Sequence, residues 1–404
     1  MPPTGLPPWR NRDVWAISLS AFFADTGYQS VLAGFPLFLV LVLHQPVWEY
    51  GLAAALSYGG GALFSVAGGR LGDHFGHRRL ALIGNSVIPL LSLSALVASP
   101  AAAIGLLSGG WWARNLRTPS RRVMLVEAVP REEDRPPAFG FLHALDVGGG
   151  ALAGLYVLAA VLAGVAFRWI FLATAVPLAL STLALSRSHT GGKGHTPSAA
   201  QVPKPAAGHG VAPVLPGARP LLVAAALYGF TYYSVGFPVL TVAQRGHHLA
   251  YGIVAFLVFQ AVSAATGYVL GPRFGTGLAA RFVDLGLLGY VASAFGSALL
   301  AAAYAAGLGA AVLILGVGVL GFALGVVETL EPSLMSMLRP GHLAGRAFGA
   351  LSAARSVGLV VANLALGLLY GVGPAWSYGY ASSVAVIAAA TILVAVPTVR
   401  RALS

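Results

Sequence analysis

Long apolar runs, separated by short polar stretches, cover nearly the whole chain. An α-helix needs about 20 apolar residues to cross a bilayer. Runs of roughly that length recur twelve times. We therefore predict an all-α membrane protein with twelve transmembrane helices, at residues 15–43, 51–69, 80–98, 101–125, 138–165, 168–186, 220–243, 250–271, 282–306, 309–330, 347–370 and 376–398. The fourth run is the least regular, because Arg114 and Arg117 lie within it.

One polar stretch is much longer than the others and is rich in Gly, Pro, Ser and Ala. This composition is typical of a flexible linker. It predicts an N-terminal six-helix bundle at residues 1–186, a cytoplasmic linker at 187–219 and a C-terminal six-helix bundle at 220–404.

Two short repeats indicate that the two bundles are related. Leu71-Gly-Asp-His-Phe-Gly76 shares four of six residues with Leu270-Gly-Pro-Arg-Phe-Gly275, and each follows the second span of its half. Ala138-Phe-Gly140 returns as Ala347-Phe-Gly349 at the start of the fifth span of each half. Repeats at corresponding places favour two pseudo-symmetric bundles.

Composition and charge agree with this picture. Hydrophobic residues make up 57% of the 404 residues and charged residues only 9%, whereas soluble domains are about one quarter charged. The net charge of +12 would suggest nucleic acid for a soluble protein, but Lys and Arg collect in the cytoplasmic loops of membrane proteins. With the N-terminus in the cytoplasm, only Arg168 and Arg245 fall outside the cytoplasmic loops and the spans. We expect a multi-pass protein of the cell (inner or plasma) membrane, with both termini cytoplasmic and no nucleic-acid partner.

The polar loop between spans two and three carries a recognisable pattern, Gly69-Arg-Leu-Gly-Asp-His-Phe-Gly-His-Arg-Arg-Leu80. It resembles the loop 2–3 signature of the major facilitator superfamily, G-x-L-x-D-R-x-G-R-[RK]. The departures are His74 and His77, where the family usually has Arg. The matching positions are Gly69, Leu71, Asp73, Gly76, Arg78 and Arg79. The resemblance implies that Asp73 meets the N-terminus of span eleven and stabilises an outward-facing state.

Other segments are similar to one bacterial branch of this superfamily whose members are described as efflux proteins. They are Arg117-Thr-Pro-Ser-Arg-Arg122 with Glu127, Phe167–Phe171, and Asp25 with Gly34–Phe38. The chain departs from the branch pattern at Gln29, Ser120 and Arg122, and Gly150–Gly154 lacks the proline of the antiporter signature. The resemblance implies the twelve-helix fold of the superfamily, a monomer, and efflux by an antiporter.

Ionisable side chains within the apolar runs are few, and each is costly to bury in a bilayer. We consider Asp25, with its neighbour Gln29, together with His143, Asp146 and Arg355, as proton-coupling or substrate-binding residues. A carboxyl group in an apolar helix is suited to take and release a proton, although a permanently hydrogen-bonded structural Asp25 is the alternative. Asp146 and Arg355 occupy matching positions of the repeat. They could form a pair across the two halves, or each could be satisfied within its own half.

Three arginines of span four, Arg114, Arg117 and Arg121, share one helical face. They could form a cytoplasmic gate with nearby carboxylates, or simply anchor a helix end. The carboxylate candidates are Glu127, Asp73, Glu328 and Glu331.

A second group of polar and aromatic residues could line a pocket, although aromatic residues in spans more often serve packing. These candidates are Tyr28, Tyr228, Tyr232, Tyr233 and Gln260. The glycine runs Gly59–Gly61, Gly148–Gly150 and Gly321–Gly325 are best interpreted as close helix contacts.

The sequence therefore predicts a secondary active transporter, a proton-coupled exporter of a small molecule that works by alternating access. A divalent-metal exporter of the same fold is an alternative, although the chain has no Cys and few ligands within the spans. A transporter-like membrane receptor is the alternative of another class. No enzyme is expected, because no nucleophile, base or metal set is clustered in the spans. No cofactor or bound metal is expected either.

Overall fold

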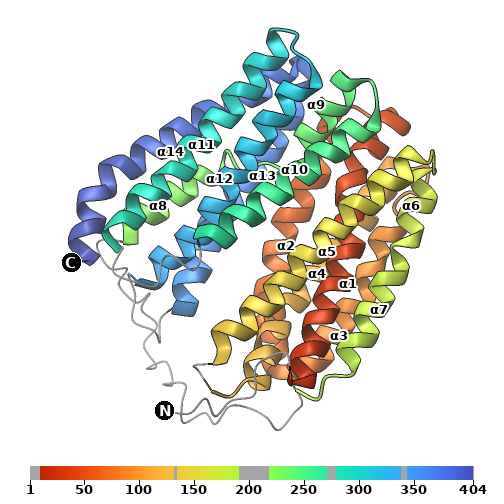
Figure 1. Cartoon of the computed structure of the whole chain (residues 1–404), viewed down its shortest axis with the longest axis vertical. Helices are drawn as coiled ribbons and strands as arrows, with labels where there is room; N and C mark the ends of the chain where they lie inside the picture. The colour runs from red at the N-terminus through yellow and green to blue at the C-terminus, as the bar shows by residue number, and fades with distance from the viewer. Residues whose placement is uncertain (1–9, 132–133, 191–217, 271–278, 338–343, 404) are drawn as a thin grey trace. The chain divides into compact units, whose positions relative to one another are not determined.

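The computed structural model describes residues 10–131, 134–190, 218–270, 279–337 and 344–403. Within these ranges every regular element is a helix, in agreement with the predicted all-α class (Figure 1). The first-half elements are α1 (Arg12–Leu37), η2 (Phe38–Val42), α2 (Val47–Phe75), α3 (His77–Val87), η3 (Ile88–Leu93), α4 (Pro100–Ala128), α5 (Arg135–Leu162), α6 (Phe167–Ala173) and α7 (Ala175–Ser186). The second-half elements are α8 (Ala218–Gly229), α9 (Gly236–Gly246), α10 (Leu249–Leu270), α11 (Ala279–Ala305), α12 (Ala310–Met337), α13 (Ala344–Val372) and α14 (Pro374–Leu403).

The chain divides into two compact units. Unit 1 comprises Met1–Gln45 and Leu56–Gln201, and unit 2 comprises Pro46–Ala55 and Val202–Ser404. The first turns of α2 thus pack within unit 2, where the Tyr50 hydroxyl lies 2.7 Å from that of Ser234. Most of the predicted linker lies outside the described residues, so its flexibility stays a prediction.

The helices of the two units pack in the same pairs. In unit 1, α1 packs on α5 and α7, α3 packs on α4 and α7, and α2 contacts α4 through the Trp112 indole, which donates to the Leu56 carbonyl. In unit 2, α8 packs on α13 and α14, α11 packs on α12 and α14, and α10 packs on α12. Each pair of unit 2 corresponds to a pair of unit 1 six spans earlier. The shared pattern supports the internal duplication that the short sequence repeats suggested.

Nine helices of the described part are long and apolar enough to cross a membrane. They correspond to the predicted spans one, two, five, six and eight to twelve, so twelve crossings stay a prediction. Span three begins as α3, but Pro89 lies at the start of η3, where the missing N–H ends the α-helical ladder. Span four is a continuous helix, α4, that carries four arginines. Span six is interrupted at Thr174 and span seven is divided into α8 and α9.

The break in span seven has a basis in the sequence. Tyr28-Gln-Ser-Val-Leu-Ala-Gly-Phe-Pro36 in α1 and Tyr232-Tyr-Ser-Val-Gly-Phe-Pro238 match at six of seven positions when two residues are missing from the second segment. Removing two residues from an α-helix shortens it by about 3 Å and turns the following face by roughly 200°. Unwinding residues 230–235 lets both flanking helices keep their packing faces. The Asn363 side-chain oxygen accepts a hydrogen bond from the Ser234 backbone N–H at 2.9 Å within this break.

Glycines allow the close helix contacts that we predicted from the three glycine runs. A Cβ atom on Gly60 would overlap the Trp112 ring, and one on Gly321 would lie 2.6 Å from the Phe259 carbonyl oxygen. Gly149 faces the Phe22 carbonyl in the same way. In bilayers, such small residues let backbones approach and maximise van der Waals contact.

Candidate functional site

The centre of unit 1 is built where α1 and α5 approach each other at Gly149. A Cβ atom on this glycine would lie 3.1 Å from the Asp25 Cβ and would overlap the Phe22 carbonyl. The backbone of α5 therefore lies directly against the turn of α1 that carries Asp25. Asp146, one turn before Gly149, is brought to the same region, and its carboxyl group lies close enough to that of Asp25 to interact with it.

Arg121 of α4 completes this group. Its Nη2 atom lies 3.3 Å from Oδ2 of Asp146, which makes both a hydrogen bond and an ion pair. Asp25 is 6% exposed, and the Arg121 side chain is 7% exposed. The Asp146 side chain is 24% exposed, so it is less enclosed by protein than Asp25. Arg121 therefore acts electrostatically on both carboxyl groups, and of the two it forms an ion pair with Asp146.

Arg117 is the most buried charged side chain described, with 1% of its surface exposed. Its Nη1 donates to the Asn85 side-chain oxygen, and Asn85 in turn donates to the Ser181 hydroxyl at 2.9 Å. The Ser181 hydroxyl also donates to the Ser20 carbonyl at 2.6 Å. Arg117 is thereby connected through Asn85 and Ser181 to α3, α7 and α1.

Arg114 lies among aromatic rings. Its guanidinium is 5.2 Å from the centre of the Tyr28 ring and 5.0 Å from that of Trp111, and its Nη2 donates to the Tyr28 hydroxyl at 3.3 Å. Tyr58 of α2 meets Trp111 edge to face, with 5.6 Å between ring centres. Cations over aromatic faces are attracted by the ring quadrupole. Arg114 is therefore held by aromatic contacts rather than by a carboxylate.

We call these five residues, Asp25, Arg114, Arg117, Arg121 and Asp146, the N-terminal charge cluster. Several of their buried polar atoms have no hydrogen-bond partner within the described part of the chain: Oδ1 of Asp25 and of Asp146, Nε of Arg117, and Nε and Nη1 of Arg121. Buried polar groups without partners are costly. The cluster therefore has an unsatisfied acceptor on each carboxyl group and spare N–H donors on Arg117 and Arg121.

Unit 2 contains a smaller charged group. Arg355 of α13 donates from Nη1 to the Glu328 carboxylate of α12 at 2.9 Å. Its guanidinium lies 5.7 Å from the centre of the Tyr228 ring and 6.0 Å from that of Tyr232. Tyr228 stacks on Tyr290 with ring centres 4.4 Å apart. An arginine, a carboxylate and tyrosines of the broken span seven thus meet inside this unit.

The sequence offered two interpretations of Asp146 and Arg355, and the structure gives each a partner within its own half. Asp146 pairs with Arg121 and Arg355 pairs with Glu328. Both pairs join the fourth and fifth spans of their unit, with the signs of the charges exchanged. A pair across the two halves stays a prediction.

Comparison with known proteins identifies the family. The family model of the Major Facilitator Superfamily matches residues 17–287, more than half of the chain. The chain belongs to the Major Facilitator Superfamily. A search of curated protein sequences finds no significant match.

Solved structures of superfamily members share the fold. The crystal structure of a D-xylose–proton symporter matches with a TM-score of 0.74 at 15% identity, covering 94% of this chain and 97% of that one. The inward-open xylose transporter XylE from E. coli gives 0.69 at 16%, covering 96% of each chain. The nucleoside transporter NupG (D323A mutant) gives 0.70 at 14%, covering 97% of this chain and 100% of that one. At these identities the likeness concerns the fold alone.

The loop 2–3 signature of the superfamily forms the turn between α2 and α3. Gly76 ends α2 with φ of +93°, a backbone conformation that favours glycine. Asp73 is well exposed and pairs with His77 at 3.3 Å, one turn away. His77 also lies 3.3 Å from the Ser120 hydroxyl. Two departures from the expected patterns, His77 and Ser120, therefore contact each other. Contact of Asp73 with span eleven stays a prediction.

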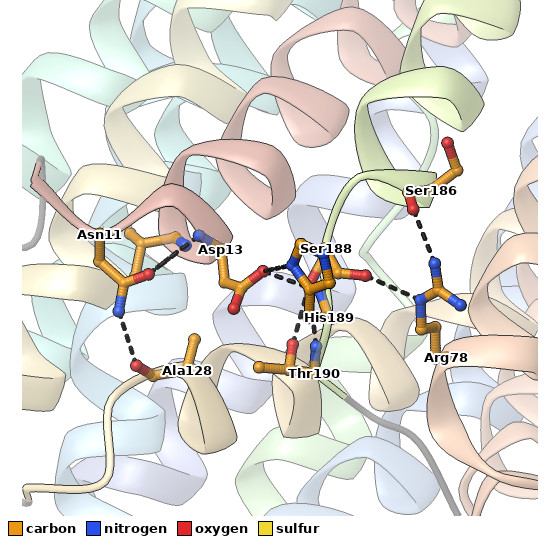
Figure 2. A network of polar contacts seen from close by, with 9 residues as sticks. Asn11, Asp13, Arg78, Ala128, Ser186, Ser188, His189 and Thr190 are labelled. Carbon is orange, nitrogen blue, oxygen red and sulfur yellow. Dashed lines mark hydrogen bonds and ion pairs between the residues drawn. The ribbon is translucent and has the colours of Figure 1, made fainter.

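Arg78 of the same signature, at the start of α3, binds the C-terminal end of α7, next to further contacts of α1 and α4 (Figure 2). Its Nε and Nη2 donate to the backbone carbonyls of Ser188 and Ser186, at 2.8 and 2.7 Å, where α7 ends. The Asp13 carboxylate accepts from the His189 backbone N–H at 2.8 Å. Asn11 caps α1 and donates to the Ala128 carbonyl at the end of α4. Arg78 thus connects the start of α3 to the end of α7, and Asp13 connects that same end to the start of α1.

The remaining predicted residues differ in burial, and one is only partly described. Gln29, Glu127 and Gln260 are half-buried, His143, His74, Arg79 and Arg122 are exposed, and Gly69 has open space around it. The Tyr233 hydroxyl lies 3.2 Å from that of Ser297. The side chain of Glu331 lies outside the described residues. Within the described part, no three His, Cys, Asp or Glu residues gather as metal ligands would.

Sequence reasoning missed Asn85, Trp111 and Asn363. Asn85 and Asn363 are polar residues within predicted apolar spans, which is a usable signal. Their partners, Arg117 and the backbone of Ser234, become evident only from the packing of the helices. Trp111 carried no distinguishing signal, because it adjoins another tryptophan in an apolar run.

Proposed function

We propose that this member of the superfamily is a proton-coupled secondary transporter that moves a small molecule by alternating access. The observation that carries the proposal is the N-terminal charge cluster, where two carboxyl groups and three guanidinium groups gather, with Asp25, Arg117 and Arg121 buried and Arg114 and Asp146 half-buried. A charge within a bilayer is costly and usually functional, so five of them in one bundle call for a role beyond packing. Asp25 and Asp146 are the proposed proton carriers, and Arg121 is the group that responds to their protonation.

The change of charge on protonation explains how coupling could work. With both carboxyls ionised, Arg121 is held by Asp146. A proton on Asp146 weakens that pair, and the freed guanidinium can turn to Asp25 or to cargo. A ligand or proton shifts a conformational equilibrium only when it binds the two states unequally. Loss and recovery of the Arg121–Asp146 pair provides such a difference.

Two further features belong to the proposal. The signature residues Asp73, Arg78 and Arg79, with Glu328 and Arg355 of unit 2, are the proposed gating groups. Both termini are proposed to lie in the cytoplasm of a cell membrane, because this orientation puts most of the 24 Lys and Arg on one side.

Export is the direction that the branch resemblance favours. The net charge of the cluster also affects the direction of transport, because it decides whether proton and cargo bind together or compete. A divalent-metal cargo has no feature of the described residues in its favour.

The test is transport in proteoliposomes that carry wild type, Asp25→Asn or Asp146→Asn, with and without an imposed proton gradient. A panel of dyes, antibiotics, divalent metals and organic acids supplies the cargo. We expect gradient-driven movement to fall at least tenfold in both variants, while exchange without a gradient persists. Asp13→Asn makes the same chemical change at the far end of α1 and should leave gradient-driven movement intact. Normal gradient-driven transport by both cluster variants would refute the coupling role.

A further inference from the structure

The charge cluster is unbalanced in favour of positive charge. The charged groups that act on Asp25 are Asp146 of α5 and Arg114 and Arg121 of α4. Arg117 is influenced by the same two arginines and the same two carboxyls. Helix α7, which also packs on α1, has no titratable residue. Because arginine stays protonated in proteins, the five side chains carry an excess positive charge even when both carboxyls are ionised.

The arginines also have donors to spare. Arg121 uses one nitrogen for Asp146, and its Nε and Nη1 have no partner within the described part of the chain. A guanidinium presents five N–H donors in a planar fork that matches a carboxylate or phosphate in a bidentate pair. An anion can satisfy these donors and offset the excess charge at once. A cation could do neither.

The aromatic side chains around Arg114 favour a ligand that also carries an apolar group. Its guanidinium is packed against the rings of Tyr28 and Trp111, and Tyr58 lies edge-on to Trp111. Three aromatic side chains beside a half-buried guanidinium suit a flat apolar group that carries an acid. Ligand sites of this kind combine an apolar lining with a few placed polar groups.

We propose that the cargo is an organic anion, an aromatic carboxylate, whose acid group binds Arg114 and Arg121 and whose ring lies against Tyr28, Trp111 and Tyr58. The proposal rests on the proposed transport function and names its substrate class. Arg117, held by Asn85, positions the α4 face rather than contacting cargo.

The same excess of positive charge determines whether proton binding strengthens or weakens the binding of the anion. A proton on Asp25 or Asp146 removes a negative charge from the cluster and so increases its attraction for an anion. Linkage is reciprocal, so bound anion also favours the protonated cluster. Proton and cargo then cross together, and an inward proton gradient drives uptake. This is the opposite of the direction that the branch resemblance implies.

Binding to the purified full-length protein tests the substrate class without a gradient. The probes are benzoate and naphthoate, each compared with its amide and with the corresponding arylmethylamine, and the readout is the thermal melting temperature over a titration. We expect the carboxylates to bind, with tenfold or greater loss of affinity in Arg114→Gln and in Arg121→Gln. Arg122→Gln is the matched control, because Arg122 is exposed on the same helix. Should Arg121→Gln fail to fold, Arg114→Gln carries the comparison.

The pH dependence tests the coupling sign. Carboxylate affinity should increase as pH falls in wild type and should be independent of pH in the double variant Asp25→Asn with Asp146→Asn. Preferential binding of the amines, binding of the carboxylates unaffected by both arginine variants, or no binding of any carboxylate would each overturn the proposal.

The two proposals fail in different ways. Carboxylate binding that needs Arg114 but does not change with pH keeps the anion site and rejects proton coupling through the cluster. Gradient-driven transport of an amine keeps proton coupling and rejects the anion site.

Discussion

Asn85 is a single amide that connects four helices. It accepts a hydrogen bond from Arg117 of α4 and donates to Ser181 and Thr182 of α7, while Ser181 itself donates to the α1 backbone. With 1% of its surface exposed, Asn85 has no solvent to replace these partners. Its role is therefore to keep the buried Arg117 hydrogen-bonded and the α4 face in place.

Replacing Asn85 with Ala should destabilise the protein. The change leaves a guanidinium N–H of Arg117 without its acceptor, and a buried unsatisfied group costs about 1–3 kcal/mol. The measurement is the melting temperature in detergent, followed by tryptophan fluorescence. Ser86→Ala, which removes an exposed hydroxyl bonded within its own helix, is the control and should change little. Equal melting temperatures for the two variants would contradict a structural role for Asn85.

At the scale of the residue, sequence reasoning found the charges but not their pairing. Asp25, Asp146 and the three arginines of span four stand out because apolar runs rarely contain charges. Which arginine meets which carboxylate depends on the rotation of each helix about its axis. A shift of one residue turns a side chain by about 100°, so spacing alone does not decide the partner.

The close contact of α1 with α5 depends on a glycine, which has no side chain to separate the two helices. Gly149 has no side chain where α5 crosses the turn of α1 that carries Asp25. Gly140 lies on the same helix with no atom within 4 Å of where its Cβ would be. Comparing the same substitution at Gly149 and at Gly140 therefore distinguishes a steric effect at the helix crossing from an effect on helix propensity.

Gly149→Val should force α1 and α5 apart and disturb the Asp25–Asp146 contact. Overpacking of this kind costs about 1–3 kcal/mol, so a lower melting temperature is expected. Transport should fall more than stability alone explains, because the proton carriers move apart. Gly140→Val makes the same change in the same helix and should be close to wild type. Indistinguishable behaviour of the two variants would mean that the crossing tolerates a side chain.

Hydropathy did not predict the break in span seven, although comparison of two segments of the sequence indicates it. Residues 220–243 form one apolar run, which predicted one helix. The two-residue deletion relative to α1 is visible only when the two tyrosine-to-proline segments are aligned. Hydropathy records how apolar a segment is, and unwinding changes the backbone without changing composition.

On the scale of the whole molecule, the chain repeats one set of helix pairings in two units while exchanging the charges. Unit 1 concentrates three arginines and two carboxyls, whereas the described part of unit 2 has Arg355 with Glu328 among tyrosines. Duplication therefore preserved the packing and left each unit with its own chemistry.

The predicted topology can be tested because the chain has no cysteine. Single-cysteine variants Pro46→Cys and Leu308→Cys should react with a membrane-impermeant maleimide on intact cells. His74→Cys and Arg131→Cys should react only after the membrane is opened. Lys and Arg are retained on the cytoplasmic side during insertion, which is the reason for this expectation. Labelling of His74→Cys from outside would reverse the orientation.

The sequence by itself determined the membrane environment, the helical class and the superfamily signature, and it identified the charged residues of the N-terminal charge cluster as candidates. These properties follow from composition and local pattern, since a bilayer demands long apolar helices whose backbone groups are satisfied internally. Only the tertiary structure decided that Arg121 meets Asp146, that Asn85 holds Arg117, and that His77 contacts Ser120. Such contacts depend on how helices distant in sequence are rotated and how closely their glycines let them approach, and no single segment contains that information.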